Sequence, residues 1–261
     1  MSVLVLTGAS GAPGVTATAL GLALAWPRDV VLVDADRAAP HTVLAGYLSG
    51  VAPQGLGVQG LLQAHRERRP LDAALAANTV DLPGAPHPKG EPDAAGRRFV
   101  PGFSHLGSVP LFDGVWTPLL DSVRGAAHDL VVDAGRPGHT GLPADLLAGA
   151  DAVGLVCRTS LVSLAGLRLH LARLLEAAPL GRVGLVLVGP GRPYAAKEVA
   201  EQFGVDVLAE VAWEPRSASD LVEAGSLPAN WSRQALARSY ARAAAALRGR
   251  MTAGLDLEGA A

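Results

Sequence analysis

The segment Thr7–Thr18, TGASGAPGVTAT, contains the residue types of a loop that grips phosphate. Gly11 and Gly14 let the backbone adopt positive φ angles and approach a ligand closely. The start of the helix that should follow adds amide donors and partial positive charge, and Thr16 is placed to offer a hydroxyl to Mg²⁺. Alternatively, the segment is a tight glycine turn in which Thr16 caps the helix.

Two later segments carry carboxylates at the ends of apolar runs. In VDADRAAPH, Asp34 and Asp36 stand two residues apart, where a carboxylate can hold a magnesium-bound water or orient an attacking one. HDLVVDAGRPG ends a buried run on Asp133, and Gly135 and Gly138 leave room for a loop that senses phosphate. Taken alone, each segment also fits a structural role, as a capped turn with solvated carboxylates or as a common strand end.

Short apolar runs alternate with helix-forming segments along the chain. This alternation predicts one doubly wound α/β domain with a mostly parallel sheet and helices on both faces. Ligands of such sheets bind beyond the carboxyl ends of the strands, so we expect the three loops to meet at one edge. The predicted strands are 3–6, 30–33, 129–133, 152–157, 183–188 and 207–211. The predicted helices are 16–26, 61–68, 71–77, 115–127, 160–177, 194–203 and 230–247.

Composition excludes several classes of protein. The net charge of −2 removes the simplest electrostatic case for nucleic-acid binding. A single cysteine, Cys157, makes neither an internal disulfide nor a cysteine-ligated iron–sulfur cluster, and we expect a reducing cytoplasm. No apolar run is long enough to span a membrane, and the N-terminus lacks the cationic start of a signal peptide.

The order and spacing of these segments resemble the ParA/MinD family of P-loop ATPases, from Ser2 to about Leu247. The family's deviant Walker A loop, GKGGxGKT, aligns with residues 9–16, LVDADRAAP resembles its first switch, and DLVVDAGRPG resembles its Walker B and second switch. ADAVGLVCRTSLVSLAGL and VAWEPRSASDLVEAG are similar to later family segments. The resemblance implies a P-loop NTPase fold of the SIMIBI type, with one domain over residues 1–249, a loop insertion at 78–98 and a flexible tail at 250–261.

The resemblance also implies roles for single residues. It implies that Mg²⁺ binds at Thr16, that Asp34 and Asp133 act on the metal through water, and that Asp36 orients the attacking water if the protein hydrolyses ATP. The nucleotide-binding positions that it implies are Gly11, Ala12, Gly14, Val15 and Thr16. Mg-ATP is the implied cofactor.

The sequence departs from the family at both loop lysines. Val15 stands at the P-loop lysine position, and Ser10 stands where the family has the lysine that reaches the nucleotide of a partner subunit. Losing one preorganised charge-stabilising donor commonly costs about 10²–10³ in kcat. We therefore expect weak Mg-ATP binding and very slow or absent hydrolysis. Arg37 and Arg136 are candidate substitutes, and VLVGPGRP lacks the asparagine with which the family often contacts the base.

Family members position septum, chromosome or pilus and secretion machinery through partners and self-association. The chain is similar to members from high-GC bacteria that are linked to pilus or septum placement. By this resemblance we expect a positioning or scaffolding protein with protein partners, a second copy of the chain among the candidates. A slow Mg-ATP-dependent switch and a small-molecule enzyme on the same scaffold remain alternatives. We expect the C-terminal helix to pack on the sheet rather than anchor to a membrane, because the tail GLDLEGAA is acidic.

Overall fold

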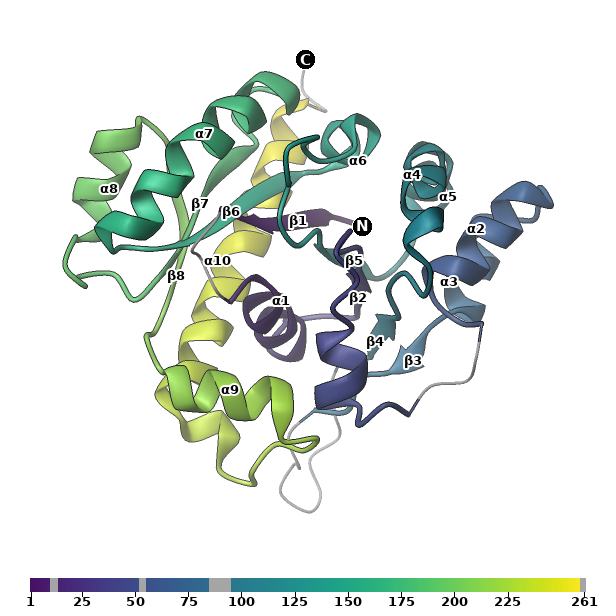
Figure 1. The fold of residues 1–261 in the computed structure, drawn as a ribbon, viewed down its shortest axis with the longest axis horizontal. Helices are drawn as coiled ribbons and strands as arrows, with labels where there is room; N and C mark the ends of the chain where they lie inside the picture. The colour runs from purple at the N-terminus through teal and green to yellow at the C-terminus, as the bar shows by residue number, and fades with distance from the viewer. Residues whose placement is uncertain (10–13, 52–54, 85–94, 259–261) are drawn as a thin grey trace.

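The computed structural model of the chain describes residues 1–9, 14–51, 55–84 and 95–258. Within them, eight strands form one sheet in the order β3-β4-β2-β5-β1-β6-β7-β8. Every neighbouring pair is parallel except β3 and β4. The predicted doubly wound, mostly parallel α/β fold is therefore confirmed (Figure 1). The strands are β1 Val3–Gly8, β2 Val30–Asp34, β3 Val80–Asp81, β4 Arg97–Val100, β5 Asp129–Asp133, β6 Ala152–Arg158, β7 Val183–Val188 and β8 Val207–Val211.

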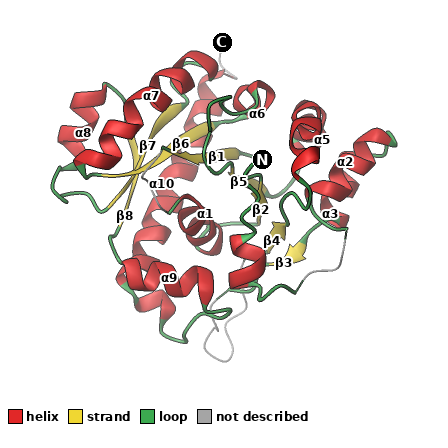
Figure 2. Cartoon of the chain, in the orientation of Figure 1, coloured by secondary structure: helices red, strands yellow, loops and turns green. Residues whose placement is uncertain are grey.

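Helices connect the strands and cover both faces of the sheet (Figure 2). The α-helices are α1 Val15–Leu24, α2 Val58–Arg66, α3 Leu71–Ala77, α4 Val109–Phe112, α5 Trp116–Val123, α6 Ala144–Gly149, α7 Leu161–Ala177, α8 Ala196–Phe203, α9 Pro215–Glu223 and α10 Ala235–Glu258. A π-helical turn, η1, spans Val43–Tyr47, and 3-10 turns span Leu106–Ser108, Asp113–Val115 and Trp231–Arg233. The sequence did not predict α4, α6 or α9.

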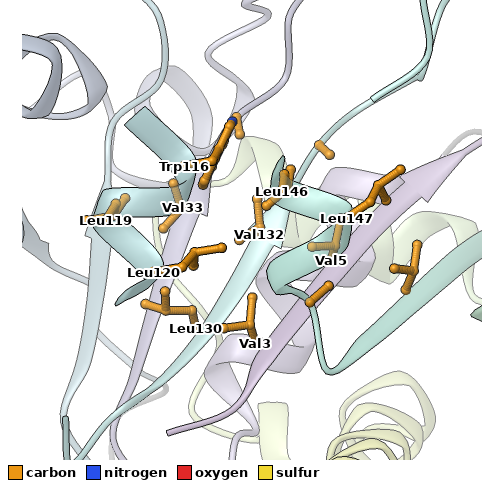
Figure 3. Close-up of a cluster of buried hydrophobic side chains, with 14 of the residues drawn as sticks. Val3, Val5, Val33, Trp116, Leu119, Leu120, Leu130, Val132, Leu146 and Leu147 are labelled. Atoms are coloured by element: carbon orange, nitrogen blue, oxygen red, sulfur yellow. The ribbon is translucent and has the colours of Figure 1, made fainter. Parts of the chain in front are cut away.

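Alternate residues of the central strands enter two hydrophobic cores. Val3 and Val5 of β1 belong to the core under α2–α8, whereas Leu4 and Leu6 belong to the core under α1, η1, α9 and α10. Figure 3 shows the first core, in which side chains of β1, β2 and β5 meet those of α5 and α6. Because side chains alternate along a strand, a fully apolar strand such as β1 is the expected result of burial on both faces.

Helix α1 is held between the sheet and α10. Gly21 faces the Tyr240 ring so closely that a Cβ at Gly21 would overlap it. The Tyr240 hydroxyl hydrogen-bonds to Thr18, and both side chains are buried. The apolar stripe predicted for the C-terminal helix thus packs against the fold. This contact fixes the helix whose first turn borders the candidate site.

Two predicted segments differ from the structure. The predicted loop at residues 78–98 contains β3 and the start of β4, and β4 pairs with β2. Charged residues at the start of β4 left only Phe99 and Val100 as an apolar signal. The tail expected from residue 250 is helical as far as Glu258, because Met251 is buried and Arg250 pairs with Asp206 at 2.9 Å.

Within the described ranges of the chain, no helix has the length and apolar character needed to cross a membrane.

Candidate functional site

Two carboxylates end neighbouring strands at the carboxyl edge of the sheet. β2 and β5 are adjacent and parallel, and Asp34 lies in register with Asp133. The Ala35 amide donates to the Asp133 carbonyl at 2.8 Å, which carries the pairing beyond both strands. Both side chains are buried, with exposed fractions of 4 % and 2 %. The alternative of solvated carboxylates therefore does not describe Asp34.

Thr16 faces the same carboxylates from the first turn of α1. Helix α1 begins at Val15, after Gly14, whose φ of 115° lies in the left-handed region that suits glycine. Gly14 occupies the N-cap position, and no side chain caps the helix. The Thr16 hydroxyl instead lies beside the Asp133 carboxylate and lowers its pKa. The structure thus brings Thr16 to Asp133, in place of the capping role considered above.

Asp36 packs directly on the loop that follows β5. Gly135, at φ 56°, approaches the Asp36 carboxylate so closely that a Cβ at Gly135 would overlap it. The Gly135 amide donates to Asp133 Oδ1 at 3.0 Å, and its carbonyl accepts from the Gly8 amide at 3.0 Å. The Thr7 hydroxyl donates to the same carbonyl at 2.9 Å. The ends of β1, β2 and β5 are therefore tied to one another around Gly135.

β4 adds a wall that sequence reasoning missed. Gly102 follows β4, and a Cβ there would lie 2.8 Å from Asp34 Cγ. The only signal was a proline–glycine pair after Phe99 and Val100, at the end of a segment predicted to be a loop. Asp34 is thus enclosed between β4 and β5, which explains its burial.

Burial dominates the electrostatics of the two carboxyl groups. Desolvation, with a smaller contribution from the nearby Asp133 carboxylate, raises the pKa of Asp34 to about 8. Desolvation likewise raises the pKa of Asp133 to about 6, although hydrogen bonds from Thr16 and Gly135 oppose the rise. Among the described residues, no cationic side chain pairs with either group. Two buried acids without a cation form a site that a bound cation would stabilise.

The donor set fits Mg²⁺ held together with phosphate, but does not fit a metal held by protein alone. Mg²⁺ prefers oxygen ligands and usually keeps several waters besides one or two protein groups and substrate phosphates. The oxygens of Thr16, Asp34 and Asp133 supply such a partial set. In the part of the chain that the structure describes, no group of three or more His, Cys, Asp or Glu side chains is placed to hold a metal.

A cleft of about 430 Å³ opens in front of these residues. Its lining includes Gly14, Val15 and Thr16 on one side and Asp36, Gly135 and Arg136 on another. The predicted site residues Gly11 and Ala12, like Ser10, lie outside the described residues. The structure therefore brings together every described residue of the predicted site at or beside one cleft.

The two candidate substitute arginines differ in position. Arg136 is exposed and lines the cleft. Arg37 pairs with Asp113 at 3.1 Å and does not line the cleft. Val15, at the position where a lysine was expected, is buried against the second core and borders the cleft. Of the two arginines, only Arg136 is positioned to meet a ligand there.

Solved structures share this fold across nearly the whole chain. The chain is similar to a ParA family ATPase from Chlorobium tepidum TLS, with 16% identity, a TM-score of 0.70 and coverage of 94% of this chain and 98% of that one. It is similar to the MinC:MinD cell division protein complex of Aquifex aeolicus, with 17% identity, a TM-score of 0.68 and coverage of 95% and 96%. It is also similar to the septum site-determining protein MinD complexed with Mg-ADP from Pyrococcus horikoshii OT3, with 16% identity, a TM-score of 0.66 and coverage of 93% and 94%.

These likenesses establish the fold, at identities too low to establish more. No family model matches the sequence, and no curated protein matches it.

Proposed function

We propose that this chain is a cytoplasmic positioning or scaffolding protein that binds Mg-nucleotide weakly and hydrolyses it very slowly or not at all. The septum, chromosomes, or pilus and secretion machinery are the settings in which we place it. Similar structures include a MinD bound to Mg-ADP and a MinC:MinD complex. They support a nucleotide site and a protein partner for this chain as well.

One observation carries the proposal. Thr16 and Asp36 line the cleft with oxygen donors, Asp133 and Asp34 lie buried beside them, and Val15 supplies no charge where a lysine would stand. When Mg²⁺ and phosphate bind there, the metal supplies positive charge to the phosphate oxygens. The chain itself orients the ligand with the Thr16 hydroxyl and the first amides of α1. A site without lysine distinguishes weakly between nucleotide states, so it shifts a conformational equilibrium only slightly.

An apolar surface on α7 supports partner binding. Leu161, Val162 and Leu169 are 67%, 78% and 80% exposed, which is unusual for large apolar side chains grouped on one helix. Leu161 also lines a groove of about 610 Å³ between α7 and α8, together with Tyr194 and Phe203. We expect Leu169→Ser to weaken partner binding or self-association while the protein remains folded.

Self-association measured by light scattering, with and without Mg-ATP, tests the scaffolding function. We expect association to persist without nucleotide and to change by less than about tenfold in Kd when Mg-ATP is added. Thr16→Ala should remove that small change and leave the association itself. Association that depends strictly on Mg-ATP and disappears in Thr16→Ala would instead mean that the site is a working switch.

A slow ATPase is the second candidate, and the position of Arg136 favours it. An arginine beside Asp36 and Gly135 can contribute positive charge during phosphoryl transfer. Steady-state hydrolysis distinguishes the candidates. Turnover that falls at least about 10²-fold in both Arg136→Ala and Asp36→Ala would establish the ATPase. Turnover at the level of a no-protein control, unchanged in both variants, supports the scaffold.

A further inference from the structure

A second cavity adjoins the cleft of the candidate site. It measures about 210 Å³ and shares Gly14, Ala17 and Val222 with that cleft. Its far wall carries Arg158, from the end of β6, and Trp213, which follows β8. A ligand with phosphate at the start of α1 and a further group beyond Gly14 would extend into this cavity.

Arg158 presents an unused donor edge there. Its guanidinium carbon lies 4.1 Å from the centroid of the Trp213 ring, within the range of a cation–π contact. Among the described residues, no carboxylate pairs with its guanidinium. Its Nε is fully buried, so the terminal nitrogens are the donors that a ligand in the cavity can reach.

The backbone around Arg158 is fixed by hydrogen bonds to three neighbouring segments. The Arg158 amide donates to the Ser163 hydroxyl at 3.0 Å. The Thr159 hydroxyl, which is buried, donates to the Gly189 carbonyl at 2.8 Å. The Gly189 amide donates to the Val211 carbonyl at 2.8 Å. The ends of β6, β7 and β8 are thereby joined, and Arg158 is held before a ligand arrives.

Gly189 gives Trp213 its place beside Arg158. A Cβ at Gly189 would lie 2.9 Å from Trp213 Cβ, and the φ of 73° at this residue suits glycine. The Ala212 amide, next to Trp213, donates to the buried Ser239 hydroxyl at 3.1 Å. The stacked pair is therefore preorganised, which lowers the entropy cost of binding a ligand against it.

The chemistry of this edge selects among planar ligands. A guanidinium only donates, and its two terminal nitrogens can act as two parallel donors. Guanine places two acceptors, O6 and N7, side by side, whereas adenine places the N6 amino donor next to N7. Glu214 also lines the cavity and can accept from a donor on the opposite edge of a base.

We propose that this second cavity binds the base of a nucleotide and that Arg158 selects guanine-type bases over adenine. The proposal rests on the proposed function in one respect, since it assumes that nucleotide phosphates bind at Gly14–Thr16. Arg158 donates to O6 and N7 of the base while its other side stays on Trp213. Glu214 accepts from the amino side of the base.

Calorimetric titration of the full chain with GDP, IDP and ADP in the presence of Mg²⁺ tests this selection. We expect GDP and IDP to bind about tenfold more tightly than ADP, a typical discrimination for a bidentate arginine contact. IDP keeps O6 and N7 but lacks the 2-amino group, so it separates the effect of Arg158 from that of Glu214. Arg158→Gln should abolish the preference and leave the ADP affinity within about twofold.

Two further variants make the result specific. Arg158→Lys keeps the charge but not the paired donors, so it should also lose the preference. Arg136→Ala, in the adjoining cleft, should weaken all three diphosphates equally and leave the ratio intact. A thermal midpoint within a few degrees of the unmodified chain verifies that each variant is folded.

Each outcome separates the two proposals. Equal affinities, tighter ADP binding, or a guanine preference that survives in Arg158→Gln would overturn the selection and leave the nucleotide site standing. Binding of none of the three diphosphates would overturn the nucleotide site itself, and base selection with it.

Discussion

The two ends of β5 carry the same residue type in opposite circumstances. Asp129, at the amino end, is fully buried and accepts from the Ser2 amide at 2.9 Å and from Trp26 Nε1 at 3.0 Å. It also lies 3.7 Å from Arg28 and 3.3 Å from Arg248. Asp133, at the carboxyl end, is just as inaccessible but has a hydroxyl and an amide as partners and no cation among the described residues. One carboxylate is neutralised within the fold, and the other is not.

This difference separates a structural carboxylate from a candidate ligand-binding one. Of the two arginines beside Asp129, Arg28 lies in the loop between α1 and β2 and Arg248 lies on α10, so the ion pairs join distant parts of the chain. At the carboxyl edge, Asp34 lies next to Asp133. A second buried carboxyl group therefore stands beside the first, where Asp129 has two arginines. A fold that neutralises one end of a strand and leaves two buried carboxyl groups at the other would be stabilised by positive charge at the second end.

The largest expected effect on stability is at the amino end of β5, where arginines neutralise Asp129. Asp129→Ala leaves Trp26 Nε1 and the Ser2 amide without their acceptor and removes the anion between two arginines. We expect the free energy of unfolding to fall by about 3 kcal/mol or more, as for other broken buried pairs. Urea denaturation measures it. Asp121→Ala is the matched control, because its ion pair with Arg124 is exposed and should contribute less than about 1 kcal/mol. Similar losses of stability in both variants would mean that the buried ion pairs of Asp129 contribute no more than an exposed one.

The second effect concerns the approach of Asp36 to Gly135. Gly135→Ala introduces both a strained left-handed residue and an overlap with the Asp36 carboxylate. Gly138→Ala is the control, since its φ of 58° is similar but nothing lies within 4 Å of the added methyl. We expect about 1 kcal/mol of destabilisation at Gly138, and about 1–3 kcal/mol beyond that at Gly135. Thermal unfolding checks this, and equal losses would mean that Asp36 moves aside freely.

The third effect is a pH dependence at the acidic end. Between the unfolded pKa of 3.8 and the folded pKa of about 8, the native state keeps a proton on Asp34 that the unfolded chain has released. The contribution of Asp34 to the free energy of unfolding therefore falls as pH rises through this window. Asp34→Asn removes this fall. The free energy of unfolding of the variant, relative to that of the unmodified chain, should therefore increase by more than about 1.4 kcal/mol between pH 4 and pH 8.

Thermal midpoints across that pH range, in the presence of a chelator, test the effect. Asp129→Asn is the contrasting variant and should be destabilised across the range. An Asp34→Asn variant that loses stability at pH 8 would show that its carboxylate has a cationic partner after all.

Much of this arrangement was predictable from the sequence. Asp34 follows a run of four apolar residues and Asp133 a run of three, and the parallel order of such runs places their ends at one edge. The meeting of Thr16 with Asp133 follows from the same rule, because β1 lies beside β5.

The remaining features depend on contacts between distant segments. Gly102 faces Asp34 because β4 pairs with β2. Only two apolar residues in the sequence indicated that strand. Arg158 meets Trp213 across the ends of three strands, through hydrogen bonds from Thr159 and Gly189 that no local pattern encodes. The arginines that neutralise Asp129 are also distant from it in the sequence. Arg28 precedes it by about one hundred residues, and Arg248 follows it by more than one hundred. Periodicity predicts elements, whereas side-chain partners depend on how those elements pack.

The smallest expected change in stability comes from giving the acidic end the cation that it lacks. Val15→Lys places an ammonium at the border of the cleft, where its stem can follow the apolar wall and its head can reach solvent or phosphate. An ammonium near Asp34 and Asp133 favours their charged forms, so the loss of stability with rising pH should become shallower. The same charge should tighten Mg-ATP binding by about tenfold, the usual scale of a hydrogen bond to a charged group. Val15→Met, which adds length without charge, is the control. If both variants behave alike in calorimetry and in the pH series, an added positive charge has no effect on Asp34 and Asp133. Their surroundings would then not differ in charge balance from those of Asp129.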